Sequence, residues 1–210
     1  MLTDKKLQKI KNSIVKNGKL DSGDSEKIYG LPSKSRARIN CYAYALGIMH
    51  PARNLYDVGF TTDTKYKDIS REKFISLICE DLKNLEIKYR IFKINDEIKL
   101  RENEYLIQAL YVSKELYYRE DFHFLRQSKA GFWYAKDGYD NTKPALTEIE
   151  ILNYEYEDGN SELVKLYSSN YSSKQYIRVA YFAIEKKKKK TIDKHLFIMY
   201  NIHYIRCFFV

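Results

Sequence analysis

The sequence predicts an α+β domain in which helices pack on a central antiparallel sheet. Apolar residues recur at helical spacing over residues 69–85. From residue 87 to residue 184 the apolar segments are instead short, and several of them alternate with period two. A short alanine-rich run opens at Cys41 and ends at Gly47, a residue type that commonly follows the last turn of a helix. The length of 210 residues fits one such domain with tails.

Two longer helices are expected in the first half of the chain. The first begins at Thr3 or Asp4 and has Leu7, Ile10 and Ile14 on one face, so it should cover the core as a short amphipathic lid. Residues 17–35 contain glycine, proline and serine and should form an irregular connection. The second helix covers residues 69–85, with Ser70 as its N-cap. Between the helices, residues 52–68 are expected to form a surface loop that walls a cleft.

The sheet is expected to contain the segments 87–94, 104–112, 121–127, 132–136 and 175–184. Gly131 permits a tight turn between the third and fourth of them, which would form a hairpin. Period two places His123 on the opposite face of its strand from Phe122 and Phe124. For residues 141–173, which are acidic and then rich in serine and tyrosine, we expect a helix or an ordered loop.

Three regions follow from this division of the chain. Residues 1–37 form an N-terminal helix and basic connection, residues 38–184 form the α+β domain, and residues 185–210 form a basic and then apolar tail. The net charge of +9 includes a run from Lys186 to Lys190, which offers contact with an anionic surface. An apolar signal region is not evident at the N-terminus, so we expect a cytoplasmic protein or one exported without a classical signal peptide.

The chemistry of the site is predicted from Cys41 and His123. A thiol is a nucleophile only as the thiolate, which is favoured by the first turn of a helix and by a neighbouring imidazole. Cys41 opens the run Asn-Cys-Tyr-Ala-Tyr-Ala-Leu-Gly, and His123 lies on a strand in Asp-Phe-His-Phe-Leu-Arg-Gln. A buried structural cysteine and a core histidine are the alternative interpretation of the same two residues.

Other classes of site find less support in the sequence. The three cysteines, Cys41, Cys79 and Cys207, are an odd number without paired spacing, so we expect no disulfide framework. Cys79 lies beside an apolar helical stripe, where we expect a structural role. The four histidines show no metal-binding spacing, so we expect no metal and no cofactor. The twenty tyrosines accompany no RNA-binding motif, P-loop or dinucleotide motif, so specific nucleic-acid recognition is not expected.

The two motifs, with the following Gly-Phe-Trp-Tyr-Ala-Lys-Asp-Gly at 131–138, resemble papain-like cysteine hydrolases of the NlpC/P60 and amidase group. The resemblance covers residues 38–138 and extends to about 184. It implies a nucleophile at Cys41, a general base at His123, and a third polar residue on the next strand that orients the imidazole. The position implied for that third residue is Ala135, which departs from the pattern, and Asp137 is the replacement that we predict.

The resemblance implies a cysteine-dependent hydrolase or acyltransferase of the peptidase or amidase kind. Its substrate would be a peptide, amide or ester, and the backbone of Cys41, with the side chain of Asn40, would stabilise the oxyanion. Two alternatives remain open. One is a catalytically inactive papain-fold module that binds a partner, for which Ala135 is the argument. The other is a basic protein that binds nucleic acid or a membrane surface, in which Cys41 belongs only to the core.

Overall fold

The computed structural model describes residues 2–14, 39–48, 56–67, 69–112, 121–128, 131–136, 147–153, 163–167 and 175–186. Within these residues the fold is α+β, which confirms the predicted class at that level. The helices are α1 (Asp4–Ser13), α4 (Cys41–Ala45) and α5 (Arg71–Asn84). The strands are β1 (Tyr89–Phe92), β2 (Glu104–Val112), β3 (Asp121–Gln127), β4 (Trp133–Ala135), β5 (Thr147–Asn153), β6 (Leu163–Tyr167) and β7 (Gln175–Glu185).

The described strands form one seven-stranded sheet in the order β1-β7-β2-β3-β4-β5-β6. All their pairings are antiparallel, and β6 also pairs with β7, so the sheet curls back on itself. β2 lies between β3 and β7 and is buried along its whole length. Its apolar residues therefore serve as the centre of the sheet, as the sequence predicts for residues 104–112.

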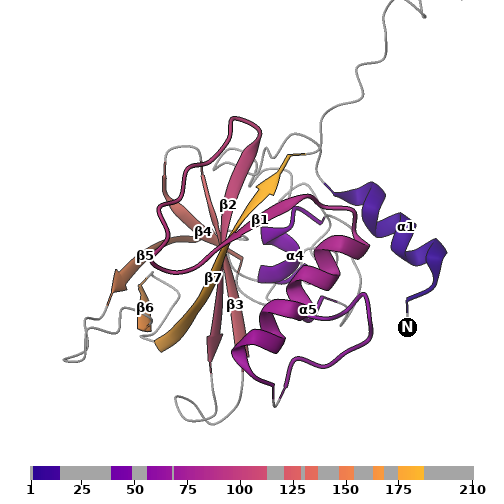
Figure 1. Ribbon diagram of the computed structural model, residues 1–210, viewed down its shortest axis with the longest axis horizontal. Helices are drawn as coiled ribbons and strands as arrows, with labels where there is room; N and C mark the ends of the chain where they lie inside the picture. The colour runs from indigo at the N-terminus through magenta and orange to yellow at the C-terminus, as the bar shows by residue number, and fades with distance from the viewer. Residues whose placement is uncertain are drawn as a thin grey trace, which may run out of the picture.

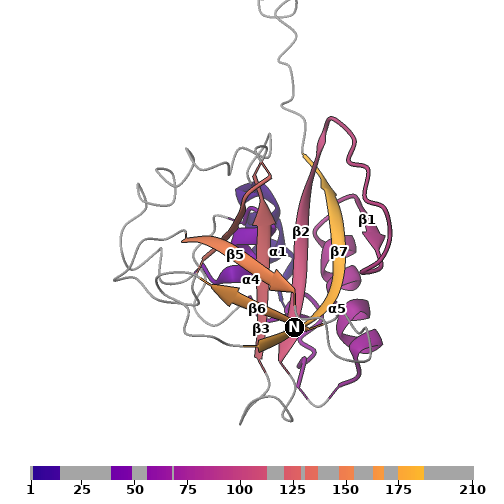
Figure 2. The same ribbon diagram turned by 90° about the vertical axis from the view of Figure 1, so that its left-hand side faces the viewer.

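The helices gather on one face of the sheet. Figure 1 shows α1, α4 and α5 on the same side of the strands, with α4 nearer the strands than α1. Figure 2, seen from the side of β5 and β6, shows these two strands in front. On the helical face, the ring of Phe124 lies 4.5 Å from that of Tyr42 in α4, and Phe122 packs 6.5 Å from Phe74 in α5. The core therefore sits between β3 and the two helices.

The opposite face of β3 carries His123. Its ring lies 5.8 Å from the ring of Tyr176 in β7, whereas its neighbours Phe122 and Phe124 belong to the helical core. The alternation predicted from the sequence is therefore confirmed. The imidazole is 5 % exposed, so β3 holds a buried titratable group between two core phenylalanines.

The two longer helices match their predictions. In α5 the Ser70 side chain accepts a hydrogen bond from the Lys73 backbone N–H at 3.2 Å, as expected of an N-cap. α1 begins at Asp4 after Thr3, whose side chain makes no capping hydrogen bond. On the predicted apolar face of the first helix, Ile10 and Ile14 are buried and Leu7 is partly buried. On that of α5 the buried residues are Phe74, Leu77, Ile78, Leu82 and Leu85.

One expectation about the sheet is wrong. Residues 141–173 were expected to hold a helix or an ordered loop, but β5 and β6 both lie there. Their signal is present in the sequence, since Ile149 and Ile151 alternate with Glu148 and Glu150. Surrounding acidic, serine and tyrosine residues obscure it, because each strand supplies only a few apolar positions.

Some predictions fall on residues that the structure does not describe. The connection at 17–35 and the tail from residue 187 onward lie outside the described residues. Among the helices that are described, none has the length and apolar character needed to cross a membrane.

Candidate active site

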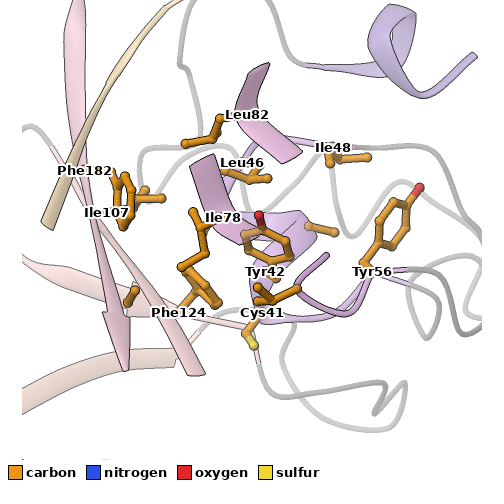
Figure 3. Packing of buried hydrophobic residues seen from close by; sticks show 14 of the residues in the cluster. Cys41, Tyr42, Leu46, Ile48, Tyr56, Ile78, Leu82, Ile107, Phe124 and Phe182 are labelled. Carbon is orange, nitrogen blue, oxygen red and sulfur yellow. The ribbon is translucent and has the colours of Figure 1, made fainter. Parts of the chain in front are cut away.

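The α4 helix places Cys41 against β3. Cys41 is the first residue of α4, and the ring of the next residue, Tyr42, lies 4.5 Å from the ring of Phe124 in β3. One helical turn further on, Arg126 Nη1 donates to the carbonyl of Ala45 at 3.5 Å. Figure 3 shows Cys41 at the border of the buried cluster, with its sulfur turned away from the labelled apolar side chains. The ring that follows Cys41 therefore packs on the ring that follows His123 in the chain.

The local sequence explains why α4 is so short. Asn40 caps it, since its Oδ1 accepts a hydrogen bond from the Ala43 N–H at 3.0 Å. The helix closes at Gly47, whose φ of 72° is the left-handed conformation that glycine adopts readily. The predicted helical run from Cys41 to a terminating glycine is therefore confirmed.

Asn40 also joins α4 to the neighbouring loop. Its Nδ2 donates to the carbonyl of Tyr56 at 2.6 Å, and the side chain is buried. Both ends of this amide thus have structural partners, one in α4 and one in the loop. A contribution of Asn40 to an oxyanion site stays a prediction.

Burial governs the chemistry of the thiol. The side chain of Cys41 is 4 % exposed, and desolvation raises its pKa from 9.0 to about 12. Backbone hydrogen bonds from Phe124 and Tyr42 and the positive charge of Lys136 act in the opposite direction, whereas the negative charge of Asp121 adds to the rise in pKa. At neutral pH the thiol is therefore protonated, and attack on a carbonyl requires a base that removes the proton.

The third predicted group cannot be placed. Ala135 is the last residue of β4 and is fully buried, and its methyl group offers no hydrogen bond. Asp137, the predicted replacement, lies outside the described residues. The departure from the papain-like pattern at Ala135 therefore stands.

Lys136, a polar neighbour of Ala135 in the sequence, is a buried residue of the candidate site. Its side chain is only 1 % exposed, although lysine is rarely buried. Its charge acts on the Cys41 sulfur. No pattern in the sequence distinguishes this lysine from an exposed one, because its burial depends on how α4 lies over the end of β4.

A buried carboxylate fixes the loop beside α4. Asp81 of α5 accepts hydrogen bonds from the Tyr42 hydroxyl at 3.1 Å and the Gly59 N–H at 2.8 Å. It also accepts from the N–H and the hydroxyl of Thr61, at 3.0 and 2.6 Å. Desolvation raises the pKa of Asp81 to about 6, and these hydrogen bonds oppose the rise. The sequence signal for this residue is an acid placed on the apolar stripe of α5.

Residues 56–67, the described part of the loop predicted at 52–68, contribute the lining of a pocket of about 470 Å³. Its lining includes Asp57, Phe60, Tyr66 and Lys67. Desolvation raises the pKa of Asp57, Lys67 lowers it, and Asp121 raises it further.

The second described cysteine has different surroundings. Cys79 lies on α5, partly buried against the core, and after burial it is the next cause of the raised pKa of Tyr89. Both Cys41 and Cys79 are free thiols. Within the described part of the chain, no three histidine, cysteine or acidic side chains form a group that could hold a metal ion.

Comparison with protein-family models, with curated proteins and with solved structures finds no match to this chain.

Proposed function

We propose that this protein is a papain-like cysteine hydrolase or acyltransferase that acts on an amide or ester through Cys41 and His123. The observation that carries the proposal is the packing of α4 on β3, where the ring of Tyr42 lies 4.5 Å from the ring of Phe124. Cys41 precedes Tyr42 and His123 precedes Phe124. The imidazole leaves β3 on the face opposite to Phe124, so the proposal requires the thiol and the imidazole to meet across the edge of this strand. The order of cysteine helix, histidine strand and following hairpin agrees with the resemblance.

The reaction begins with a neutral thiol. As the Cys41 sulfur attacks the carbonyl carbon, the imidazole of His123 takes the sulfur proton. The negative charge that develops on the carbonyl oxygen is stabilised by the backbone N–H of Cys41 and the Asn40 side chain. His123 then gives its proton to the leaving amine or alcohol, which leaves a thioester on Cys41. Water or another acceptor attacks the thioester carbon and passes a proton to His123. The C–S bond then breaks, the acyl product leaves, and the sulfur takes the proton from His123, which restores the thiol.

The hollow walled by Asp57, Phe60, Tyr66 and Lys67 is the place that we assign to the substrate. Its volume of about 470 Å³ lies in the range of small-molecule sites. The mixture of aromatic rings with charges of both signs suits a short peptide or an amide with polar groups. The lysine run from Lys186 to Lys190 would act separately, by holding the protein near an anionic surface.

The proposal is tested with p-nitrophenyl acetate, a small activated ester. We expect a burst of p-nitrophenol that is stoichiometric with the protein, and an acetyl group located on Cys41 by peptide mass spectrometry. Cys41→Ala should abolish the burst, whereas Cys79→Ala should leave it unchanged. An acetyl group on Cys79 or on surface lysines, with none on Cys41, would refute the proposal.

A second candidate is a papain-like module that binds a peptide or glycan without turnover. Ala135 favours it, because the residue implied to orient the imidazole has no polar group. The two candidates differ in the ester experiment, since the binding module should show no burst and no adduct on Cys41.

A further inference from the structure

The outer edge of β1 is open in the described part of the sheet. Among the described strands β1 pairs with β7 alone, and it lies at the margin of the sheet beyond β7 (Figure 2). The Glu185 N–H donates to the Lys88 carbonyl at 2.9 Å, and the ladder continues with Tyr89 opposite Ile184. Hydrogen-bonded and non-hydrogen-bonded pairs alternate along an antiparallel ladder. Tyr89 and Ile91 therefore belong to non-hydrogen-bonded pairs, and their N–H and C=O groups point away from β7.

These outward backbone groups can receive a further strand. An extended peptide that joins a sheet edge exchanges hydrogen bonds with every second residue of that edge. On β1 those residues are Tyr89 and Ile91, each of which offers one donor and one acceptor. The Ile91 side chain is 45 % exposed, so an added strand would also cover apolar surface. The next outward N–H, that of Lys93, donates to Asp96 Oδ2 at 2.8 Å, which ends the open edge.

A cavity of about 480 Å³ borders the first half of β1 and is rich in positive charge. Its charged lining consists of the bases Lys83, Lys88, Arg90 and Arg101 and the acids Glu104 and Glu185. Arg90 and Glu104 neutralise each other, since Arg90 Nε donates to Glu104 Oε1 at 3.0 Å. The Lys88 side chain is 80 % exposed, and its ion pair with Glu185 is long, at 3.8 Å. The Arg101 side chain is 68 % exposed and lies 4.0 Å from Glu104. The charge that faces solvent is therefore positive.

We propose that the edge of β1 binds an acidic segment of a partner protein as an added strand, with a carboxylate of that segment in the cavity beside Lys88 and Arg101. The row of backbone donors and acceptors matches a peptide chain and not a phosphate backbone. The positive charge favours carboxylates on that peptide. It also repels a second copy of β1, because like charges would meet across the new strand pair. This surface does not depend on the proposed reaction, since Cys41 lies on α4, which packs on β3.

The proposal is tested with a fluorescein-labelled peptide that alternates valine and glutamate over six residues. Its binding to the full chain is measured by fluorescence polarisation, and we expect a Kd in the micromolar range. Two control peptides separate strand pairing from charge. One has every amide N-methylated, which keeps the charge but removes the donors along both edges of the peptide. The other has lysine in place of glutamate. Neither control should bind.

Variants of the protein locate the binding surface. Ile91→Pro removes an outward N–H and leaves the ladder to β7 in place, a position where strands tolerate proline. It should lower the affinity at least about tenfold, because the ring also blocks the added strand, whereas Ile91→Val should bind as the wild type does. Lys88→Gln with Arg101→Gln should weaken binding about tenfold. Lys9→Gln with Lys73→Gln removes the same charge at exposed positions on α1 and α5 and should leave the affinity unchanged.

Equal affinity for the N-methylated and unmodified peptides would show charge attraction alone and would overturn the proposal. Absence of binding up to about 1 mM, or unchanged affinity in folded Ile91→Pro, would overturn it as well. Self-association of the full chain that Ile91→Pro removes, measured by analytical ultracentrifugation, would assign the edge to a second copy instead. If Ile91→Pro does not fold, as judged by circular dichroism, the N-methylated peptide and the charge variants decide the question. Cys41→Ala should bind the peptide as the wild type does, so failure of the proposed function would leave this result unaffected.

Discussion

The ring of Tyr42, the residue after Cys41, lies 4.5 Å from the ring of Phe124, the residue after His123. This contact joins a short helix from the first quarter of the chain to a strand from its middle. His123 immediately precedes Phe124, and its imidazole lies on the opposite face of β3. The proposed chemistry therefore depends on how firmly α4 is held against β3, by Asn40 at its start and by the Asp81 cluster beside it.

The thiol of Cys41 should remain protonated through the neutral range. Its pKa of about 12 results mainly from burial, so a thiolate should form only well above pH 9. We expect the difference in absorbance at 240 nm between wild type and Cys41→Ser to stay flat from pH 6 to pH 9. A step centred near pH 7 would instead show a preformed thiolate–imidazolium pair.

The packing of the loop at residues 56–67 can be tested at Gly59, with Gly131 in the β3–β4 turn as a matched control. Gly59 and Gly131 have φ values of 88° and 91°, both in the left-handed region. A Cβ at Gly59 would lie 2.5 Å from the Thr64 carbonyl oxygen, whereas one at Gly131 would meet nothing within 4 Å. Gly131→Ala should therefore cost about 1 kcal/mol of stability, and Gly59→Ala should cost about 3 kcal/mol or more. Urea denaturation measures both, and equal costs would contradict the packing of this loop.

Asp81→Asn should destabilise the fold. In the wild type, Tyr42 and Gly59 donate to one carboxylate oxygen of Asp81, and Thr61 donates twice to the other. The asparagine amide replaces one of these oxygens with an NH₂ group, so the donors that faced that oxygen lose their acceptor. Leaving such buried donors without an acceptor costs about 1–3 kcal/mol in the free energy of unfolding. Glu97→Gln, at a side chain that is 78 % exposed, serves as the control and should have little effect. A loss for Asp81→Asn no larger than that of the control would contradict the role of the carboxylate.

Asp81 should also make stability depend on pH. Its pKa is about 6 in the fold and 3.8 ordinarily, so the folded protein binds a proton between these values that the unfolded chain does not bind. The contribution of this group to the free energy of unfolding is therefore largest below pH 4 and falls by about 3 kcal/mol as the pH rises through 6. The stability difference between wild type and Asp81→Asn, measured from pH 4 to pH 7, should shrink accordingly. A difference that grows with pH would place the folded pKa below 3.8.

The sequence was informative where burial followed a simple period. The bounds of β2 and β3 agree with the segments predicted at 104–112 and 121–127, because each has a continuous or alternating apolar pattern between turn residues. β5 and β6 were missed because their alternation is short and set among acidic and hydroxyl side chains. Their pairing depends on the curl of the whole sheet, which brings β6 back to β7.

The candidate site was predictable only in part. Cys41 and His123 were chosen because nucleophile and base chemistry demands those residue types. Asn40 was chosen as an oxyanion residue, and the structure shows that it caps α4. The burial of Lys136 and the four hydrogen bonds at Asp81 arise from contacts between segments far apart in sequence. Local sequence patterns do not show such contacts, so the sequence alone could not predict the burial of Lys136 or the role of Asp81.

The most direct test of the proposed mechanism is the rate at which p-nitrophenyl acetate acylates Cys41 at pH 7.5, in wild type and in His123→Ala. If His123 removes the thiol proton during attack, the variant should acylate at least about a hundredfold more slowly, the usual contribution of a general base. Acylation of Cys79 in the same samples should be equal and serves as the internal reference. Equal acylation rates of Cys41 in the two folded proteins would show that the thiol and the imidazole do not act together.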